Sequence, residues 1–309
     1  MIDRAKRNGI EVMAWTADEL YGRDGAFLDG LDERLEAFVV EIPPNAHVWL
    51  SKPKVLKTPP RNNTGRPRKY PRLRKRERKP REVRNLVRYS SGFRRQTPQR
   101  YRIKDTSRGS EVWEIRWRTC WRKTHTQTLV SRQCTLIVAR NVLTGELKYF
   151  LANRAPGRDG WSLRKLLRVA FGRWPIEECF RKAKEELGLD HYECRGWQCI
   201  HRHLYVTILT GLFCARARRQ LATTDDVESG ELLTVEQVRR AADVFVGSLD
   251  LPPRYRKQLY QEEADRQTYH ARRNAQAAKS HRKTRRKRLR ELGIDPDKIK
   301  SVPPKPPKC

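Results

Sequence analysis

The chain has 309 residues, enough for one large domain or two ordinary ones. It carries 68 Lys and Arg against 36 Asp and Glu, a formal net charge of +32, and 37% of its residues are hydrophobic. That hydrophobic content is low but still permits a folded core. The longest apolar run, residues 204–215, is too short to cross a bilayer, and no charged-then-apolar leader opens the chain, so we expect neither a membrane partner nor a signal peptide. Seven scattered cysteines indicate a reducing compartment rather than a secreted disulfide scaffold.

The positive charge is concentrated in two segments. Residues 51–110 hold 22 Lys/Arg and 3 Asp/Glu, and residues 271–309 hold 14 and 3, whereas residues 1–50 hold 5 and 10. Two basic arms on a globular body favour binding to DNA or RNA, because each cation placed on a phosphate releases a counterion. A membrane-surface patch is the alternative, but residues 71–80 lack the apolar face that such a patch needs. The candidate DNA contacts in this run are Arg72, Arg74, Lys75 and Arg76.

The N-terminal half combines short buried strands with one helix and the first arm. Residues 11–15 and 37–43 are typical of buried strands, and residues 24–35 show helical periodicity. The apolar positions on one side of this helix are Phe27, Leu28, Leu31 and Leu35. Residues 51–108, rich in Pro, Arg and Asn, are expected to be largely irregular.

The second half changes from strands to helices. Residues 112–121, 128–142 and 147–151 are strand candidates, the last two joined as a hairpin through residues 143–146. From residue 162 to 221 the pattern is helical, followed by a linker at 222–230, a helix at 234–246 and a basic tail. We therefore expect an α/β protein divided at 1–50, 51–110, 111–155, 156–221 and 222–309.

The segment 171–192 contains the most informative pattern. Pro175 suits the first turn of a helix, where its missing N–H costs nothing. The apolar stripe expected to face a core is Ile176, Phe180, Ala183 and Leu187. A second face of the same helix carries Glu177, Arg181 and Lys184, and Arg173 leads into it.

Glu177 has two interpretations. A carboxylate flanked by cations on one helix edge can bind a metal beside a phosphate backbone. Alternatively, Glu177 and Glu178 in a first turn do no more than complement the helix dipole. On spacing alone the dipole interpretation is favoured, because acidic first turns are common.

Asp18 follows a short predicted strand, and strand ends hold side chains rigidly enough for a site. An N-cap or turn aspartate is an equally good interpretation of the sequence. Two-metal phosphoryl chemistry requires carboxylates from different elements to converge. Asp18 and Glu177 together can be part of such a set.

Other candidate sites rank lower. Cys194, Cys199, His201 and His203 invite a zinc interpretation, but their spacing differs from that of usual zinc sites. Cys179 is expected in the core rather than as a nucleophile. The alternation of Trp113, Ile115 and Trp117 fits the buried face of a strand better than a base-stacking surface, with Arg116 and Arg118 pointing outward.

The stretch Arg173-Trp-Pro-Ile-Glu177 with Lys184 resembles the R-x3-E-x6-K signature of bacterial insertion-sequence transposases, DDE enzymes with an RNase H-like catalytic fold. The runs 188–197 and 201–204 are also similar to that group. Residues 15–22 resemble the segment that carries its second catalytic aspartate. The resemblance covers roughly residues 1–220 and includes the β-rich insertion that precedes the glutamate.

The resemblance implies roles for individual residues. Asp18 would be the second metal-ligand aspartate and Glu177 the catalytic glutamate, both binding Mg²⁺ or Mn²⁺. Arg173 and Lys184 would contact DNA phosphates near the cleaved end. The signature's tyrosine is not matched, because Ala170 stands at that position. The resemblance also implies transposon-end and target DNA as partners, a homodimer in the DNA complex and a cytoplasmic, nucleoid-associated location.

The family's first aspartate lies on a strand that precedes two others. Only 17 residues precede Asp18 here, too few for three strands of about 5–6 residues each. Asp3, in an apparent helix ending at Gly9, is a poor substitute. The expectation is a partial RNase H-like core from a truncated, catalytically impaired transposase that binds DNA without cutting it. A non-enzymatic basic nucleic-acid-binding protein is the alternative, and it leaves Arg173, Glu177 and Lys184 unexplained.

Overall fold

The computed structural model describes residues 2–56, 71–106, 108–124, 129–221 and 233–302. The chain forms two compact units, Met1–Arg173 with His281–Cys309, and Trp174–Ser280. Each unit is described by itself. In the described part, no helix combines the length and apolar character needed to span a membrane.

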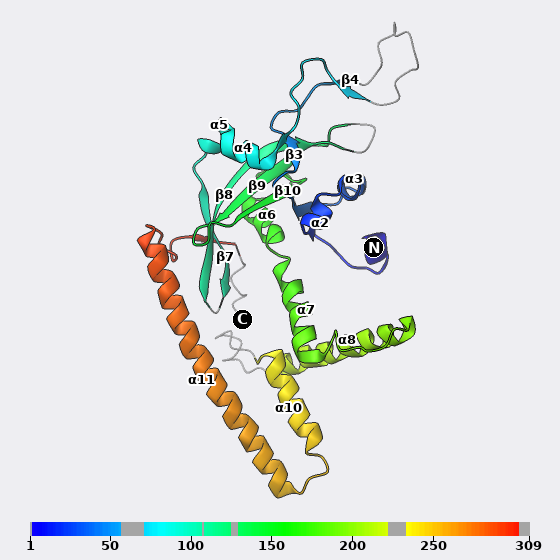
Figure 1. Cartoon of the computed structure of the whole chain (residues 1–309), viewed down its shortest axis with the longest axis vertical. Helices are drawn as coiled ribbons and strands as arrows, with labels where there is room; N and C mark the ends of the chain where they lie inside the picture. Colours follow the sequence, from blue (N-terminus) through cyan, green and yellow to red (C-terminus); the bar gives the residue numbers. More distant parts are fainter. Residues whose placement is uncertain (1, 57–70, 107, 125–128, 222–232, 303–309) are drawn as a thin grey trace. The chain divides into compact units, whose positions relative to one another are not determined.

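The first unit is built around a mixed β-sheet (Figure 1). Its helices are α1 (Ile2–Arg7), α2 (Glu19–Gly22), α3 (Gly25–Glu33), α4 (Val83–Tyr89), α5 (Ser91–Arg94) and α6 (Leu163–Ala170). Its strands are β1 (Trp15–Ala17), β2 (Phe38–Glu41), β3 (His47–Trp49), β4 (Val55–Leu56), β5 (Arg72–Leu73), β6 (Arg81–Glu82), β7 (Gln99–Thr106), β8 (Gly109–Arg122), β9 (Cys134–Asn141), β10 (Leu147–Ala152) and β11 (Lys300–Ser301).

The strand order in the main sheet is β1-β2-β10-β9-β8-β3-β6, and β7 also pairs with β8. The strands β1 and β2 run parallel, with Trp15 opposite Phe38 and Ala17 opposite Val40. The strands β2, β10, β9 and β8 are joined by antiparallel ladders. This mixed α/β architecture is compatible with the expected RNase H-like fold.

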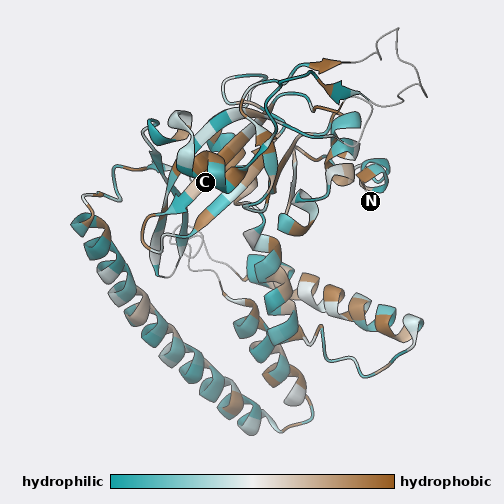
Figure 2. Cartoon of the chain, turned by 45° about the horizontal axis from the view of Figure 1, so that its top comes forward, coloured by the Kyte–Doolittle hydropathy of each residue, from teal (hydrophilic) through white to brown (hydrophobic). Residues whose placement is uncertain are grey.

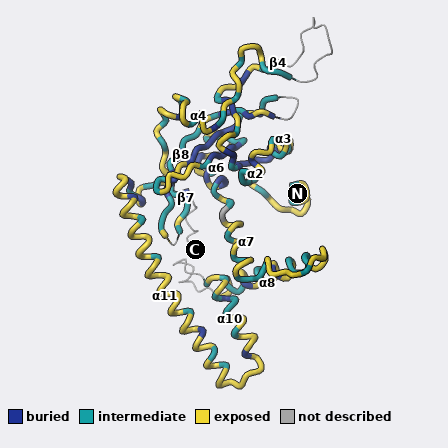
Figure 3. Tube along the Cα trace, viewed as in Figure 1, coloured by how far each residue is buried: buried dark blue, intermediate teal, exposed yellow. Residues whose placement is uncertain are grey.

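Helices pack against both faces of the sheet because the strand side chains alternate between the faces. In β9, Ile137 and Ala139 join one core cluster together with α6. Their neighbours Leu136 and Val138 join the opposite cluster, to which α3, α4 and α5 contribute. The strands of this sheet form the most deeply buried part of the chain (Figure 3).

The N-terminal elements follow the sequence pattern with two corrections. The strand predicted at 11–15 is displaced to Trp15–Ala17, because only these residues find a partner along β2. The predicted helix is α3, in which Leu28 and Leu31 are buried. Leu35 does not share that face: it follows the helix end with a φ of 58° and is exposed.

The β-rich segment was predicted well. The three strand candidates correspond to β8, β9 and β10. The middle strand begins only at Cys134, since Leu129 has a φ of 61°, which an extended strand does not accommodate. Along β8, Trp113 and Ile115 are buried and Arg118 is exposed, as the alternation predicts.

The prediction of largely irregular basic arms is wrong for residues 81–106 and for residues 271–291, whereas residues 71–80 contain no regular element beyond the two-residue strand β5. Residues 81–106 form β6, α4, α5 and β7, and Val83, Leu86 and Phe93 are buried in the core. The second arm is helical as far as Glu291 in α11 (Pro253–Glu291). In both segments the high content of Lys and Arg suggested irregular structure. The regularly spaced apolar residues and helix-forming residues between them nevertheless form helices and strands. Residues 57–70 of the first arm lie outside the described residues, as does the predicted linker at 222–230.

A buried ion pair joins β8 to α3 in the first unit. The Arg122 guanidinium donates to Asp29 at 2.6 Å and to Asp32 at 2.7 Å, and the Arg122 side chain is only 5% exposed. Asn153 adds a hydrogen bond to Asp32 at 3.0 Å. Burial alone would lower the pKa of Arg122, but hydrogen bonds and charge from the two carboxylates outweigh it and raise that pKa. The β-rich segment is thereby fixed to α3.

The second unit is helical, as predicted, and contains α7 (Trp174–Leu187), α8 (Trp197–Gln220), α10 (Val235–Gly247) and α11 as far as Ser280. The apolar stripe expected to be buried on α7 is instead partly open, with Ile176 50% and Phe180 55% exposed. Cys179, expected in the core, is also exposed. Apolar residues recur along α8, whereas α11 is mainly hydrophilic (Figure 2). A 3.6-residue pattern predicts the helix correctly but does not identify what covers its apolar side.

Candidate functional site

Asp18 stands at the junction of β1 and α2. It follows the last residue of the strand, and its extended backbone makes it the N-cap of α2, where its carboxylate accepts the Tyr21 N–H at 3.3 Å. The strand-end and N-cap interpretations of the sequence therefore both describe the same residue. The Asp18 side chain is 39% exposed, so the helix end orients the carboxylate without sealing it from solvent.

Arg173 forms an ion pair with Asp18, although it lies 155 residues later, at the end of the segment Met1–Arg173. Its Nη1 lies 3.5 Å from the Asp18 Oδ2, and its side chain is 33% exposed. The segment leading to it is fixed by Phe171, whose ring lies 5.1 Å from those of both Trp113 and Phe150. The structure thus brings together two of the residues singled out in the sequence.

The position of the missing tyrosine lies within this fixed segment. Ala170 ends α6 and is buried in the core cluster on that face of the sheet. A side chain at this position belongs to the core of the unit, so the absence of a hydroxyl here is compatible with the packing.

The ion pair between Asp18 and Arg173 is exchangeable. Exposed pairs of this kind contribute little to stability, because water competes for both partners. The Asp18 carboxylate can therefore bind a cation, and the Arg173 guanidinium can bind a phosphate oxygen.

Glu177 and Lys184 lie on α7, in the second unit. Glu177 occupies the first turn beside Pro175, Lys184 lies in the last turn, and both residues are exposed. Hydrogen bonds from Arg181 and then Lys182 lower the pKa of the neighbouring Glu178, which belongs to a salt-bridge network within the helix.

The α7 helix has a defined end. Gly188 has a φ of 68°, which suits a residue without a Cβ, and the Leu189 N–H donates back to the Ala183 carbonyl at 3.0 Å. The His203 Nε2 lies 2.8 Å from the Gly188 carbonyl oxygen and ties α8 to this turn.

Cys194 and Cys199, considered as zinc ligands, form a disulfide. This disulfide occupies both sulfurs of the zinc candidate, and His203 is engaged with the Gly188 carbonyl.

The four candidate cations of the first arm lie on a small hairpin. The strands β4 and β5 pair antiparallel, and the Arg74 N–H donates to the Lys54 carbonyl at 2.9 Å. Arg74, Lys75 and Arg76 form the turn after β5 and are exposed, and Arg72 is half-buried within β5. The strand β5 and the turn that follows it therefore present these side chains.

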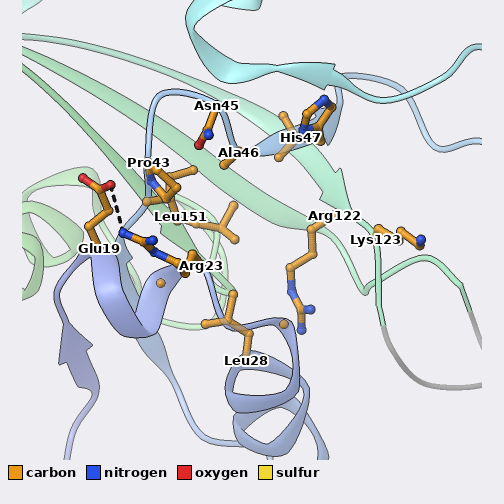
Figure 4. Close-up of a pocket in the computed structure, with 14 residues that line it drawn as sticks. Glu19, Arg23, Leu28, Pro43, Asn45, Ala46, His47, Arg122, Lys123 and Leu151 are labelled. Atoms are coloured by element: carbon orange, nitrogen blue, oxygen red, sulfur yellow. Dashed lines mark ion pairs between the residues drawn. The ribbon is translucent and has the colours of Figure 1, made fainter.

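A pocket of about 480 Å³ lies beside α2 in the first unit (Figure 4). Its walls include Arg23, His47 and Lys123, and Arg23 forms an ion pair with Glu19 at 3.6 Å. The lining is mixed, because it also contains Glu19 and apolar residues such as Leu28 and Leu151. Sequence reasoning missed this pocket because its residues are separated along the chain and form no local motif.

Carboxylates and phosphates are the ligands that Mg²⁺ prefers, and the ion is usually held by one or two carboxylates plus substrate phosphates. The accessible, oriented carboxylate of Asp18 fits one place in such a set. Among the described residues, no group of three His, Cys, Asp or Glu side chains is arranged to hold a metal.

Comparison with known families gives one match. Residues 1–110 match the family model described as DDE superfamily endonuclease. The match includes Asp18, ends before the Arg173–Lys184 pattern and supports a DDE-type, transposase-like protein. It indicates a transposase-type nuclease function, with DNA as the substrate and divalent metals as the general requirement of such enzymes. A search of curated proteins found no match.

Proposed function

We propose that this chain is a transposase whose chemistry is metal-dependent DNA cleavage and strand transfer at insertion-sequence ends, in a catalytically impaired form. The observation that carries the proposal is the placement of Asp18. This residue lies inside the DDE-matching segment, at the carboxyl end of a parallel strand, with its carboxylate oriented by α2 and paired with Arg173.

Asp18 and Glu177 are the proposed ligands for Mg²⁺ or Mn²⁺. The geometry of α2 supports Asp18. Glu177 is supported by its spacing from Arg173 and Lys184. When bound, a divalent ion polarises the phosphodiester and activates the attacking oxygen.

The cationic residues position the DNA. The Arg173 guanidinium exchanges its weak pairing with Asp18 for a phosphate oxygen, which frees the carboxylate for the metal. Lys184 supplies a second phosphate contact, and the basic hairpin around Arg72 and Arg74 supplies sequence-independent contacts. The proposed assembly is a pair of chains, each holding one DNA end, in a bacterial nucleoid.

The impairment follows from the size of the acidic set. Two-metal phosphoryl chemistry requires carboxylates from different elements to converge on both ions, and the proposed set supplies only Asp18 and Glu177. DNA binding depends on the separate basic residues, so it persists where cleavage fails.

The test measures metal binding and cleavage separately. Electron paramagnetic resonance of Mn²⁺ with a DNA duplex is expected to show ion binding that Asp18→Asn and Glu177→Gln each reduce. The matched controls Glu19→Gln and Glu178→Gln remove the same charge one residue away and are expected to leave it unchanged. Equal Mn²⁺ binding by all five proteins overturns the ligand assignment.

The nicking assay addresses the impairment. The chain alone is expected to give no Mg²⁺-dependent nicking of plasmid DNA. Nicking that Glu177→Ala abolishes overturns the impairment and supports an active endonuclease.

A non-enzymatic DNA-binding protein is the second candidate. It is favoured by the concentration of positive charge in residues 51–110 and 271–309. The same Mn²⁺ experiment distinguishes the candidates, because a pure binder has no Asp18-dependent metal site.

A further inference from the structure

The last turns of α11 are docked on the β7–β8 hairpin within the first unit (Figure 1). Leu289 is 1% exposed and Ile294 3% exposed, and both pack against Val112 of β8. The Arg285 Nη1 donates to the Gly109 carbonyl at 3.1 Å. Gly109 lies close beneath the helix, since a Cβ there would meet the Arg285 Cδ at 3.3 Å.

The chain after the helix strengthens this docking. Strand β11 pairs parallel to β7, with Lys300 opposite Tyr101. Val302 is buried in the main core, and its N–H donates to the Arg102 carbonyl at 2.9 Å. The end of α11 is thus held to the sheet by apolar packing, hydrogen bonds and an added strand.

The opposite face of the docked helix is cationic. Arg285 and Leu289, four residues apart, face the sheet, and residues spaced three and four apart on the other side share the outer face. The outer residues are Lys283, Arg286, Lys287 and Arg290, and all are exposed. Arg286 pairs with Asp297, and Lys287 lies 4.0 Å from Glu291.

Two of these cations have no acidic counterpart. Within the part of the chain that the structure describes, neither Lys283 nor Arg290 forms an ion pair. Lys283 and Arg290 are seven residues apart, about 10 Å along the axis, or roughly three phosphate intervals of one DNA strand.

We propose that the outer face of residues 281–290 binds the phosphate backbone of duplex DNA, as a contact surface separate from Asp18 and Glu177. The choice of DNA rests on the proposed function. A membrane surface fits less well, because the apolar residue of this stretch, Leu289, is turned inward and buried. A helix already docked on the sheet binds DNA without losing the ordering entropy that an irregular arm would lose.

The test compares two double variants that each remove two exposed cations. Lys283→Gln/Arg290→Gln changes the outer face of α11, and Arg4→Gln/Arg7→Gln changes exposed positions of α1 in the acidic N-terminal segment. Glutamine keeps the helix propensity, which circular dichroism at 222 nm checks. Binding of a duplex of arbitrary sequence is measured by fluorescence anisotropy from 50 to 300 mM salt.

Each lost phosphate contact lowers the slope of log K against log salt by about 0.9, so the α11 variant is expected to lose about 1.8. Extrapolated from 1 M salt, this is an affinity loss of about 30-fold at 0.15 M. The α1 control is expected to change the slope little. Equal slopes for the α11 variant and the unmodified chain overturn the proposal, as does an equal loss in the α1 control, which indicates a net-charge effect only.

Further readouts keep this inference distinct from the proposed function. The α11 variant is expected to retain Asp18-dependent Mn²⁺ binding, so failure of one proposal leaves the other measurable. Loss of binding to vesicles of phosphatidylserine and phosphatidylcholine, with DNA binding unchanged, assigns the face to a lipid surface and overturns the DNA assignment.

Discussion

Replacing Arg122 by Met tests whether the buried ion pair fixes the β-rich segment to α3. Methionine keeps much of the aliphatic length and removes the charge. The carboxylates of Asp29 and Asp32, with side chains 7% and 16% exposed, then lose their cation in a site that excludes water. We expect the first unit to be strongly destabilised, because a buried charge without a partner is costly.

Breaking one partner of a buried ion pair typically costs about 3–5 kcal/mol. Two features place Arg122→Met toward the lower end of this range. Asp32 keeps its hydrogen bond from Asn153 at 3.0 Å, and the Arg122 Nε, itself buried, already has no partner in the described structure. For a unit of this size, each kcal/mol lowers Tm by about 2–4 °C, so we expect a fall of about 6–12 °C.

Urea unfolding followed by tryptophan fluorescence is the suitable assay, since six of the eight tryptophans lie in residues 1–173. The matched control is Arg100→Met, which breaks an outward-facing pair with Glu114 at 3.3 Å and is expected to cost at most about 1 kcal/mol. Adding Asp29→Asn to Arg122→Met is expected to restore part of the loss, because it removes one buried charge. A loss in Arg122→Met no greater than that in Arg100→Met would refute the reasoning.

Three further predictions concern other parts of the chain. Hydrogen bonds from Lys6 and then the Trp15 indole lower the pKa of Glu36 from its ordinary 4.5. The ionised carboxylate therefore stabilises the fold above pH 4.5, and this contribution to stability is lost as the pH falls through the lowered pKa. Glu36→Gln is therefore expected to lower Tm at pH 7 and to approach the unmodified chain at pH 3; an unchanged difference would contradict this. Burial raises the pKa of the Cys134 thiol to about 11, so iodoacetamide at pH 8 is expected to label exposed Cys179 in the folded chain and Cys134 only in urea, as peptide mass spectrometry can show. Thr234→Ala removes the capping box of α10, for an expected loss of about 1 kcal/mol, and faster hydrogen exchange confined to α10 checks it.

The sequence predicts local structure best where one periodicity dominates. The strands β8 to β10 alternate cleanly and were placed to within a few residues, except for the start of β9. The segment at 81–106 was missed, because its composition indicated an irregular arm while a few spaced apolar residues decided its folding. Those residues are stabilised by partners on β2 and β9, which a local pattern does not specify.

Long-range partners explain the remaining differences. No local feature of the sequence around Arg122 predicts that this residue is buried. Its structural role depends on the carboxylates of Asp29 and Asp32, about 90 positions earlier in the chain. The docking of α11 likewise depends on Val112 and Gly109, far from it in sequence. A basic run in a sequence therefore does not by itself predict irregular structure.

The candidate site likewise combines features that the local sequence predicts with a contact that it does not predict. The sequence singled out Asp18 as a strand-end or N-cap residue and Arg173 as part of a helix-leading signature, two features without any local link. Parallel pairing of β1 with β2 and the aromatic packing of Phe171 then place their charged groups 3.5 Å apart. An aspartate that only capped α2 would need no cation from a distant segment. If Arg173→Gln lowers DNA-end affinity while Asp18→Asn lowers Mn²⁺ binding, the pair holds substrate and metal as separate partners; if both variants change only the stability of α2, the pair is structural.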